Sequence, residues 1–398
     1  MSLVLILRIW SRHLSLALLF AFLALGSARP ANFDLSPLNK KDWTLGHAKH
    51  LLERAGFGAT YQEINRVYRL GPEQAVQLIL TGGAIERLAP FEEFEHSGIF
   101  DQSLDPFPPS RPALTAAAKI SGEGLGIKVR EGVNRPLQPI VNKFFYWLRA
   151  SRLETDRVVY WWANEMLKTD HPLKEKIALF WHGHFAVNED KVRDYRKMLG
   201  MLNLLRKHGL GSAEDLVNLV AKDPAMLVFL DAGVNTKNAP NENFAREIME
   251  MFTLGDGKYS ERDVREGARA FTGWEVEGLN FNFASTNHDN GKKTFLNETG
   301  SFGGEDIIEI IFEQNGCGDF IARKLFTFFV TENVPDSLRS ELGEILRSAD
   351  YDVSELLKTI FLSKGFYSEE IVGQRIKGPV ELMVSTYRKL NISKVPGN

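Results

Sequence analysis

The sequence is poor in cysteine and carries no excess of positive charge. Its 398 residues include one cysteine, Cys317, so the chain cannot form an internal disulfide. Stability must come from the burial of apolar side chains, which a chain of this length can supply. Cys317 lies between glycines in QNGCGDF, where a buried thiol is favoured over a catalytic one. The formal net charge is −3, so nucleic acid is not expected as a partner.

Long apolar runs are absent beyond the N-terminus. The run LSLALLFAFLAL at residues 14–25 follows Arg8 and Arg12 and precedes the small residues Gly26-Ser27-Ala28. This pattern is typical of a signal peptide, here residues 1–28. The run is shorter than the ~20 residues that a membrane-spanning helix needs, although an N-terminal anchor is the alternative. We expect a Sec-type export to the periplasm or the exterior, with no membrane span after cleavage.

Capping residues and helix breakers divide residues 29–398 into helices, which we expect to form a single large α-helical domain. Thr60 followed by Glu63 is a capping box, and Gly71-Pro72 ends one helix and begins the next. Ser260 with Asp263 repeats the capping pattern. Further helices are expected within 137–220, 240–254 and 305–391.

Two stretches depart from the helical pattern. Residues 84–136 are rich in proline and glycine and predict an irregular excursion. Residues 279–283 read LNFNF, an alternation of apolar and polar side chains, and the turn-forming NHDNG and then KKTF follow. The predicted fold class is therefore mainly α, a multi-helix globular bundle with one small β-hairpin near residues 279–296.

The segment FWHGHF at residues 180–185 contains two histidines that could bind a metal. On a helix His184 lies on the apolar stripe, whereas His182 lies about 200° around the axis. The two rings could grip one ion together only if the helix ended at Gly183. A hydrogen-bonded core histidine at 184 and a surface histidine at 182 are the favoured interpretation, and a metal site is the alternative.

Residues 240–255, PNENFAREIMEMFTLG, predict an amphipathic helix with Glu247 at the edge of its apolar face, beside Asn243. Partial burial would raise the pKa of this carboxyl unless a partner from another segment satisfied it. Arg246 is placed to pair with surface glutamates. An interhelical ion pair and a site role for Glu247 remain open.

A third polar group comes from the turn at residues 287–291. His288 and Asp289 are expected to be exposed at its tip, where loop residues often carry function. Asn, Asp and Gly are also the ordinary residues of turns, so a purely structural role is the alternative.

The chain resembles the bacterial family named domain of unknown function 1800. The resemblance rests on these segments: LLERAGFGAT (51–60), ALFWHGHF (178–185), DPAMLVFLD (223–231), NENFAREIMEMFTLG (241–255), YSERDVREGARAFTGW (259–274), HDNGKKTF (288–295), IARKLFTFFV (321–330) and IKGPVELMVSTYRKL (376–390). It implies an exported, mostly helical protein and supplies no activity. It also implies a companion exported protein similar to sulfatases and phosphatases as a partner. Family members usually continue further, so we expect the C-terminal part to be truncated relative to the family.

Two functions follow from these features. The first is a secreted hydrolase, dependent on a divalent metal, with His184, Glu247, Asn243 and Arg246 as catalytic residues. Its metal ligands would be His182, His184, Glu247, His288 and Asp289. Neither G-x-S-x-G nor H-E-x-x-H occurs in the sequence. The second is a non-catalytic exported helical scaffold that binds a partner protein or a polysaccharide.

Overall fold

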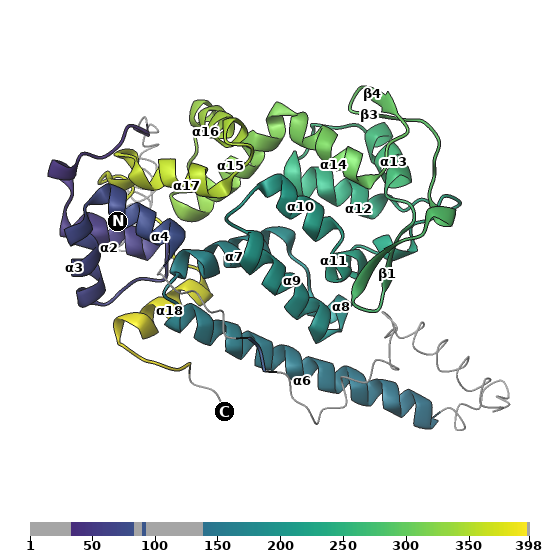
Figure 1. The fold of residues 1–398 in the computed structure, drawn as a ribbon, viewed down its shortest axis with the longest axis horizontal. Helices are drawn as coiled ribbons and strands as arrows, with labels where there is room; N and C mark the ends of the chain where they lie inside the picture. Colours follow the sequence, from purple (N-terminus) through teal and green to yellow (C-terminus); the bar gives the residue numbers. More distant parts are fainter. Residues whose placement is uncertain (1–32, 83–89, 93–137, 396–398) are drawn as a thin grey trace, which may run out of the picture.

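The computed structural model describes residues 33–82, 90–92 and 138–395, and it confirms a mainly α-helical fold (Figure 1). The predicted signal peptide and nearly all of the predicted excursion at 84–136 lie outside the described residues. Within the described part of the chain, no helix is both long and apolar enough to cross a membrane.

Three short helices open the described chain after the 3₁₀ turn η1 (Lys40–Asp42). They are α2 (Leu45–Arg54), α3 (Tyr61–Leu70) and α4 (Pro72–Thr81). The predicted capping box begins α3, where the Thr60 hydroxyl accepts from the Glu63 amide and the Glu63 carboxylate accepts from the Thr60 amide. Pro72 begins α4, as its fixed φ angle favours.

The long helix α6 (Gln138–Lys168) runs along one side of the molecule (Figure 1). The central helices follow: α7 (Pro172–Phe185), α8 (Glu189–Val192), α9 (Tyr195–His208), α10 (Ala213–Ala221) and α11 (Pro224–Phe229), with the turn η4 (Ala232–Val234). A buried ion pair ties α9 to α7, because Arg206 contacts Glu175 at 2.6 Å. Trp162 of α6 donates to the same carboxylate at 2.7 Å, so one buried group joins three helices.

The helix at residues 242–253 changes its winding halfway. The α-helical part α12 (Glu242–Glu247) continues directly into the π-helix η5 (Ile248–Thr253). The buried Thr253 hydroxyl donates to the Ile248 carbonyl at 2.6 Å. The next helix, α13 (Glu261–Ala270), begins with the predicted Ser260–Asp263 capping box.

The strands form two hairpins where one was expected. Strand β1 (Trp274–Glu277) pairs with β2 (Asn280–Phe283), and after the turn η6 (Ser285–Asn287), β3 (Lys293–Phe295) pairs with β4 (Glu298–Gly300). The segments 279–283 and 292–295 are thus strand-forming as predicted, but they do not pair with each other. The reason is local: Leu296 and Asn297 both have positive φ angles, of 45° and 73°, the backbone of a tight hairpin turn.

The C-terminal third returns to helices, as predicted. They are α14 (Gly304–Glu313), α15 (Asn315–Phe329), α16 (Asp336–Ser348), α17 (Val353–Leu362) and α18 (Pro379–Lys389), with the turn η7 (Gly365–Tyr367) between the last two. Cys317 is a buried free thiol, and burial raises its pKa.

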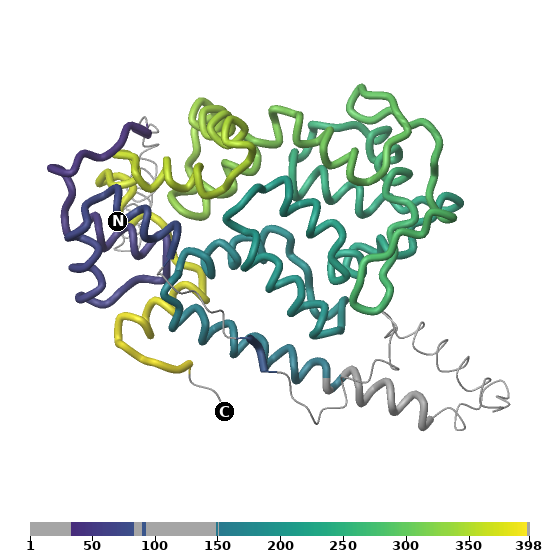
Figure 2. Tube along the Cα trace, in the orientation of Figure 1, coloured from purple at the N-terminus to yellow at the C-terminus, as the bar shows by residue number. Residues whose placement is uncertain are grey.

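The two ends of the described chain lie side by side, with the purple N-terminal helices against the yellow C-terminal segments (Figure 2). The amide of Leu38 donates to the carbonyl of Leu362 at 2.8 Å, and α4 packs against α17. Elements that are far apart in sequence therefore build this part of the molecule together.

Candidate functional site

The two histidines of FWHGHF lie on different sides of one helix. Helix α7 continues through Gly183 to Phe185 and ends at Ala186, which has a φ angle of 50°. The His184 ring lies among aromatic side chains, and its Nε2 bonds the Phe252 carbonyl at 3.0 Å. His182 packs against the Trp162 ring, with centroids 5.5 Å apart. His184 therefore supports the π-helix that contains Phe252.

The polar residues around Glu247 bond different partners, and none of these partners is Glu247. Arg246 pairs with Glu261 at 2.8 Å and with Glu242 at 3.4 Å, and Asn243 donates to the Leu230 carbonyl at 3.2 Å. Glu247 itself is half-buried, and burial, with Glu250 nearby, raises the pKa of its carboxyl as expected.

His288 and Asp289 stabilise the loop that carries them. His288 is buried, contrary to the expectation of an exposed turn tip, and its Nδ1 lies 2.8 Å from the Thr272 carbonyl. Asp289 accepts from Arg269 at 2.7 Å, and this guanidinium lowers the pKa of the carboxyl. The turn is held against α13, because Arg269 donates to the Asp289 carboxylate and the Thr272 hydroxyl accepts from the Asp289 amide.

The predicted metal ligands are not brought together. In the described part of the chain, no group of three or more His, Cys, Asp or Glu side chains could hold a metal ion. The five predicted ligands belong to four separate neighbourhoods. His182 packs against Trp162, His184 bonds η5, His288 and Asp289 share the loop next to Arg269, and Glu247 lies on α12. His184, His288 and Asp289 each have another partner. Backbone carbonyls contact a ring nitrogen of His184 and of His288, and Arg269 pairs with Asp289.

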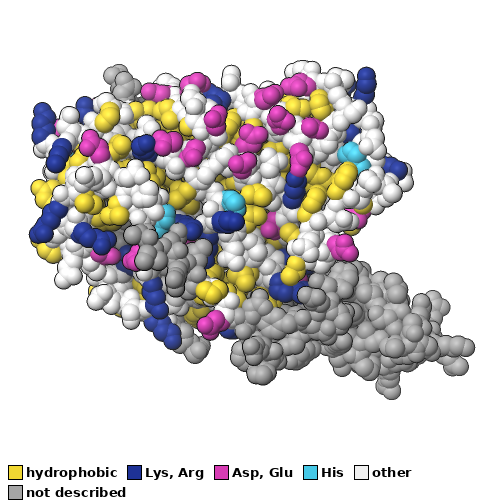
Figure 3. Space-filling view, viewed as in Figure 1, with side chains coloured by type: hydrophobic (Ala, Val, Ile, Leu, Met, Phe, Trp, Pro, Cys, Tyr) yellow, Lys and Arg dark blue, Asp and Glu magenta, His cyan; other side chains and the backbone are white. Residues whose placement is uncertain are grey.

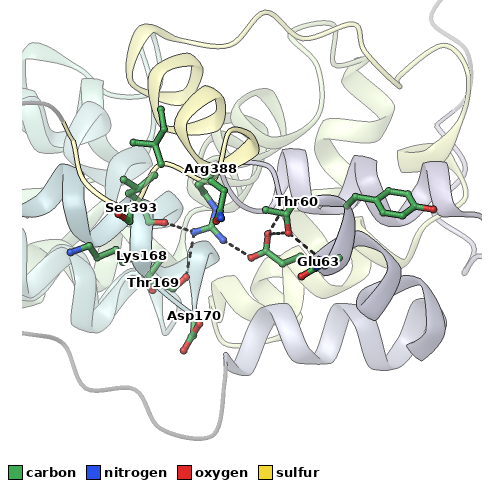
Figure 4. A pocket seen from close by; sticks show the side chains of 12 residues that line it. Thr60, Glu63, Lys168, Thr169, Asp170, Arg388 and Ser393 are labelled. Carbon is green, nitrogen blue, oxygen red and sulfur yellow. Dashed lines mark hydrogen bonds and ion pairs between the residues drawn. The ribbon is translucent and has the colours of Figure 1, made fainter.

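One cavity of about 510 Å³ lies between α3, the end of α6 and the C-terminal residues (Figure 4). Arg388 lies in its wall and pairs with Glu63 at 3.1 Å. It also donates to the carbonyls of Gly58 at 3.2 Å and Leu167 at 3.0 Å. The side chains of Lys168 and Asp170, which also line the cavity, point away from Arg388 (Figure 4). Arg388 is thus already bonded within the protein and serves to hold three segments together.

A second cavity, of about 410 Å³, differs in its charge, and we call it the cationic pocket. Helix α2 forms one wall, and the segment 372–377 with the end of α18 forms the other. Its charged or titratable lining residues are Lys49, His50, Glu53, Arg54, Arg375, Lys377 and Lys389. Five cationic side chains therefore surround the cavity, and Glu53 is the one carboxylate among the described residues that line it.

The acids at the cationic pocket are already shared between several cations. Glu53 pairs with both Lys377 and Lys389, and these lysines lower the pKa of its carboxyl against the effect of burial. Behind the wall, the buried Glu381 pairs with Lys176 and, at 2.8 Å, with Arg375. Burial would raise the pKa of Glu381, but these cations lower it to about 2. The carboxylates of Glu53 and Glu381 are thus each paired with two cations.

Arg54 is the most deeply placed cation of this pocket, with 6% of its surface exposed. Its Nε and Nη2 donate to the carbonyls of Phe329 and Phe328, both at 2.8 Å, at the C-terminal end of α15. Burial, and after it the nearby Arg375, lower the pKa of Arg54 to about 10. The carbonyl end of a helix favours a cation, so α15 positions this guanidinium. Among the described residues, none accepts a hydrogen bond from its Nη1.

Lys176 adds positive charge directly behind the cationic pocket. It is buried, donates to the Gly56 carbonyl at 3.0 Å and lies 4.9 Å from the Phe57 ring centroid. Burial, opposed by Glu381 and reinforced by Arg54 and Arg375, lowers its pKa to about 8. Burial thus disfavours the charged forms of both Arg54 and Lys176.

The residues of the cationic pocket are far apart in the sequence, and no sequence pattern predicted that they would lie together. Glu53 and Lys377 are 324 positions apart and make an ion pair. Each lies within, or next to, a segment that carries the family resemblance, LLERAGFGAT or IKGPVELMVSTYRKL. The available signal was the repeated basic residues at 375, 377, 388 and 389, which also fit an ordinary solvated surface.

In the space-filling view, acidic side chains gather across the upper half of the visible face, and basic ones are frequent at the left, over the N-terminal helices (Figure 3). Charge is thus unevenly distributed over this face, although the formal net charge of the chain is only −3.

The model of the family described as "Protein of unknown function (DUF1800)" matches residues 50–397. No curated protein and no solved structure matches the chain. Because the match spans nearly the whole chain, the protein belongs to the DUF1800 family.

Proposed function

We propose that this member of the DUF1800 family is an exported helical protein that binds an anionic ligand in the cationic pocket. The observation that carries the proposal is the charge imbalance: five cations and one carboxylate among the described residues of the lining. Like charges held close together in a partly desolvated space repel one another. A carboxylate, sulfate or phosphate group would relieve that repulsion and accept hydrogen bonds from the lysine and arginine donors.

Comparison with Arg388 distinguishes a binding site from a purely structural ion network. Arg388 gives its donors to Glu63 and to backbone carbonyls, so its charge is compensated within the protein. In the cationic pocket, Lys49 is exposed at the rim, and no ion pair joins it to another described residue. The Nη1 of Arg54 is likewise unused by described residues. These groups are available to a ligand.

Binding is favoured here over metal-dependent hydrolysis. Neither His184 nor Glu247 lines either of the two cavities described above. A general base must lie within hydrogen-bond reach of the group that it deprotonates. The expected scaffold function therefore takes a more definite form: recognition of an anionic group, such as one on a polysaccharide.

Export and partnership are part of the proposal. Export rests on the pattern of residues 1–28, a charged start followed by a short apolar run and small residues. The companion of sulfatase- or phosphatase-like type, implied by the family resemblance, would act on sulfate or phosphate esters. Both classes of compound carry the anionic groups that the cationic pocket suits.

Calorimetric titration with inorganic sulfate and phosphate at constant ionic strength tests the proposal. We expect saturable binding of one anion per chain. Lys49→Gln is expected to weaken it several-fold, because a cation at the rim contributes on the order of 1 kcal/mol. Lys41→Gln, which changes an exposed lysine of η1 outside the pocket, is the matched control. Absence of binding, or equal effects of the two variants, would overturn the proposal.

A further inference from the structure

Helix α18 turns polar side chains toward the protein interior. Its buried residues are Glu381, Val384 and Ser385. Glu381 pairs with Lys176, and the Ser385 hydroxyl accepts a hydrogen bond from Lys377 at 2.6 Å. An ordinary surface helix does the reverse, because its apolar stripe faces the core and its polar side chains face water.

The outward side of α18 is apolar. Residues three or four positions apart lie on the same side of a helix. The exposed residues with this spacing, and those that flank them, are Pro379, Val380, Leu382, Met383, Thr386 and Leu390. Thr386 is the one polar member of this set. Single exposed aliphatic side chains are ordinary, whereas a group of them on one side of a helix indicates an interaction surface.

Ile376, shortly before α18, is 90% exposed. Its neighbours turn inward, because Arg375 pairs with Glu381 and Lys377 pairs with Glu53. The charged side chains thus fold back on the protein, and the isoleucine projects into solvent. We call the following residues the apolar face: Ile376, Val380, Leu382, Met383 and Leu390. None of them lines the cationic pocket or the cavity beside Arg388.

The charge around the apolar face has one sign. In residues 371–395 the one carboxylate, Glu381, is buried, and the basic residues are Arg375, Lys377, Arg388, Lys389 and Lys394. Lys389 and Lys394 are exposed. The whole chain has 51 acidic and 48 basic residues, so this excess of positive charge is local. Exposed aliphatic side chains with basic neighbours are typical of segments that lie in the surface of an anionic membrane.

We infer that the apolar face binds the surface of an anionic phospholipid bilayer. Ile376 and the outward side chains of α18 would insert among the lipid chains, and Lys389 and Lys394 would lie near the lipid phosphates. A second copy of the chain suits this face less well, because a symmetric contact would bring two sets of basic residues into one interface. The inference is separate from the proposed function, since the apolar face and the lining of the cationic pocket have no residue in common.

Co-sedimentation with vesicles tests the inference. The chain from residue 29 onward is used, so that the apolar run at 14–25 does not itself bind lipid. We expect binding to vesicles of mixed phosphatidylglycerol and phosphatidylcholine. Binding to phosphatidylcholine alone, or to the mixed vesicles at high salt, should be weaker, because the attraction to anionic headgroups is then absent or screened.

Variants assign the binding to the apolar face. Ile376→Ser is expected to weaken binding to the mixed vesicles about tenfold, the effect of losing one buried aliphatic side chain. Val234→Ser is the matched control, because Val234 on η4 is 70% exposed and lies outside the apolar face. The double variant Leu382→Gln, Met383→Gln, whose new residues favour helix, gives a second measurement should Ile376→Ser not fold.

A fluorescent dye attached to the apolar face locates the contact. Cys317 is the only cysteine of the chain and is buried, and burial raises the pKa of its thiol, so Met383→Cys supplies one reactive site. We expect the emission of an environment-sensitive dye at this site to shift to shorter wavelength when mixed vesicles are added. Val234→Cys, labelled in the same way, should show no shift.

Several results would overturn the inference. They are absence of vesicle binding, equal binding to the two kinds of vesicle, equal losses in Ile376→Ser and Val234→Ser, and an unshifted dye at position 383. A dimer seen by sedimentation velocity without lipid, and abolished by Ile376→Ser, would also overturn it, because a second copy would then cover the apolar face. Sulfate binding in the cationic pocket is measured separately by calorimetry, so either claim can fail without the other.

Discussion

Single side chains in the cationic pocket differ in how far their charge is compensated. Glu53 is shared by Lys377 and Lys389, whereas Arg54 depends on two backbone carbonyls. Without Glu53, the two lysines would repel each other. Lys49 has no ion pair with a described residue, so its removal should cost little stability. We therefore expect Lys49 to contribute affinity for an anion and Glu53 to contribute stability.

Replacing Glu53 by Gln removes the negative charge that Lys377 and Lys389 share. We expect the free energy of unfolding to fall by about 1–3 kcal/mol, because partly buried cations lose their charge partner. Anion affinity should rise in the same variant, because the lining loses its one described carboxylate. Urea denaturation and calorimetry measure the two effects. Loss of both stability and anion affinity would contradict this division of roles.

The buried His184 predicts a pH dependence of stability. Burial lowers its folded pKa from 6.5 to about 4, so the unfolded chain binds the proton more readily. The stability that neutral His184 contributes is present above pH 6.5. It is lost as the pH falls from 6.5 towards 4. By linkage, about 2 kcal/mol should be lost between pH 7 and pH 5.

Replacement by Gln isolates that contribution. His184→Gln keeps a polar group near the Phe252 carbonyl and removes the titration, so its free energy of unfolding should change less between pH 7 and pH 5 than that of the wild type. Urea denaturation at both pH values is the measurement. Equal pH dependence in the two proteins would show that His184 does not titrate as described.

Among the elements, the π-helix η5 carries the clearest local constraint. Its winding is rare in proteins and is often found near functional positions. Here His184 bonds the Phe252 carbonyl, and Thr253 bonds the Ile248 carbonyl. Both contacts satisfy backbone groups, which gives the motif a structural explanation. The apolar spacing of 242–254 predicted a helix, but π winding depends on these tertiary bonds and has no comparable sequence signal.

Thr253→Val removes the donor to the Ile248 carbonyl while keeping the shape of the side chain. We expect a loss of about 1–3 kcal/mol in the free energy of unfolding, because a buried carbonyl loses its partner. Thr386→Val is the control, since the Thr386 hydroxyl donates to Leu382 on the exposed side of α18. Similar losses in both variants would argue against a special role for Thr253.

The turn after α2 brings glycine close to the cationic pocket. Gly58 has a φ angle of 78°, and a Cβ there would lie 3.2 Å from Lys389 Cε and 3.3 Å from a Glu53 carboxylate oxygen. Gly58→Ala is expected to cost about 1–2 kcal/mol for the backbone conformation and to weaken sulfate binding, because the Glu53–Lys389 pair must shift. Gly200→Ala in α9, with nothing within 4 Å, should be neutral or stabilising. Unchanged sulfate binding in a folded Gly58→Ala protein would contradict the close packing described here.

The boundaries of the helices were largely predictable, and the pairing of the strands was not. Thr60, Pro72 and Ser260 mark helix starts by chemistry local to a few residues. The strand error arose because the asparagine- and glycine-rich segment 287–291 resembles a turn more strongly than Leu296-Asn297. Tertiary contacts with Arg269 and Thr272 decide the conformation of that segment.

At the scale of the whole molecule, binding would join the two ends of the described chain. Helix α2 supplies one wall of the cationic pocket, and the region from Val372 to Lys389 supplies the other. No periodicity or motif spacing relates residues so distant in sequence. The predicted metal ligands were also drawn from distant segments, and among the described residues no three of them form a group that could hold a metal ion.

A ligand that bridges these walls should stabilise the folded chain. At a sulfate concentration 100 times the dissociation constant, we expect about 2.7 kcal/mol of added stability, and hence a higher melting temperature. Lys49→Gln should show a smaller increase at the same concentration. Chloride at equal ionic strength is the control, and an equal increase with chloride would indicate a non-specific salt effect.

The central claim, that the pocket between α2 and the C-terminal segment holds an anion, is tested most directly by locating one. Crystals of the protein would be soaked in selenate, a sulfate analogue, and its selenium found by anomalous scattering. We expect a selenate bound among Arg54, Arg375 and Lys49, and no selenate there in the Lys49→Gln, Arg375→Gln double variant. Ordered selenate elsewhere on the molecule, with none in the cationic pocket of the wild type, would contradict it.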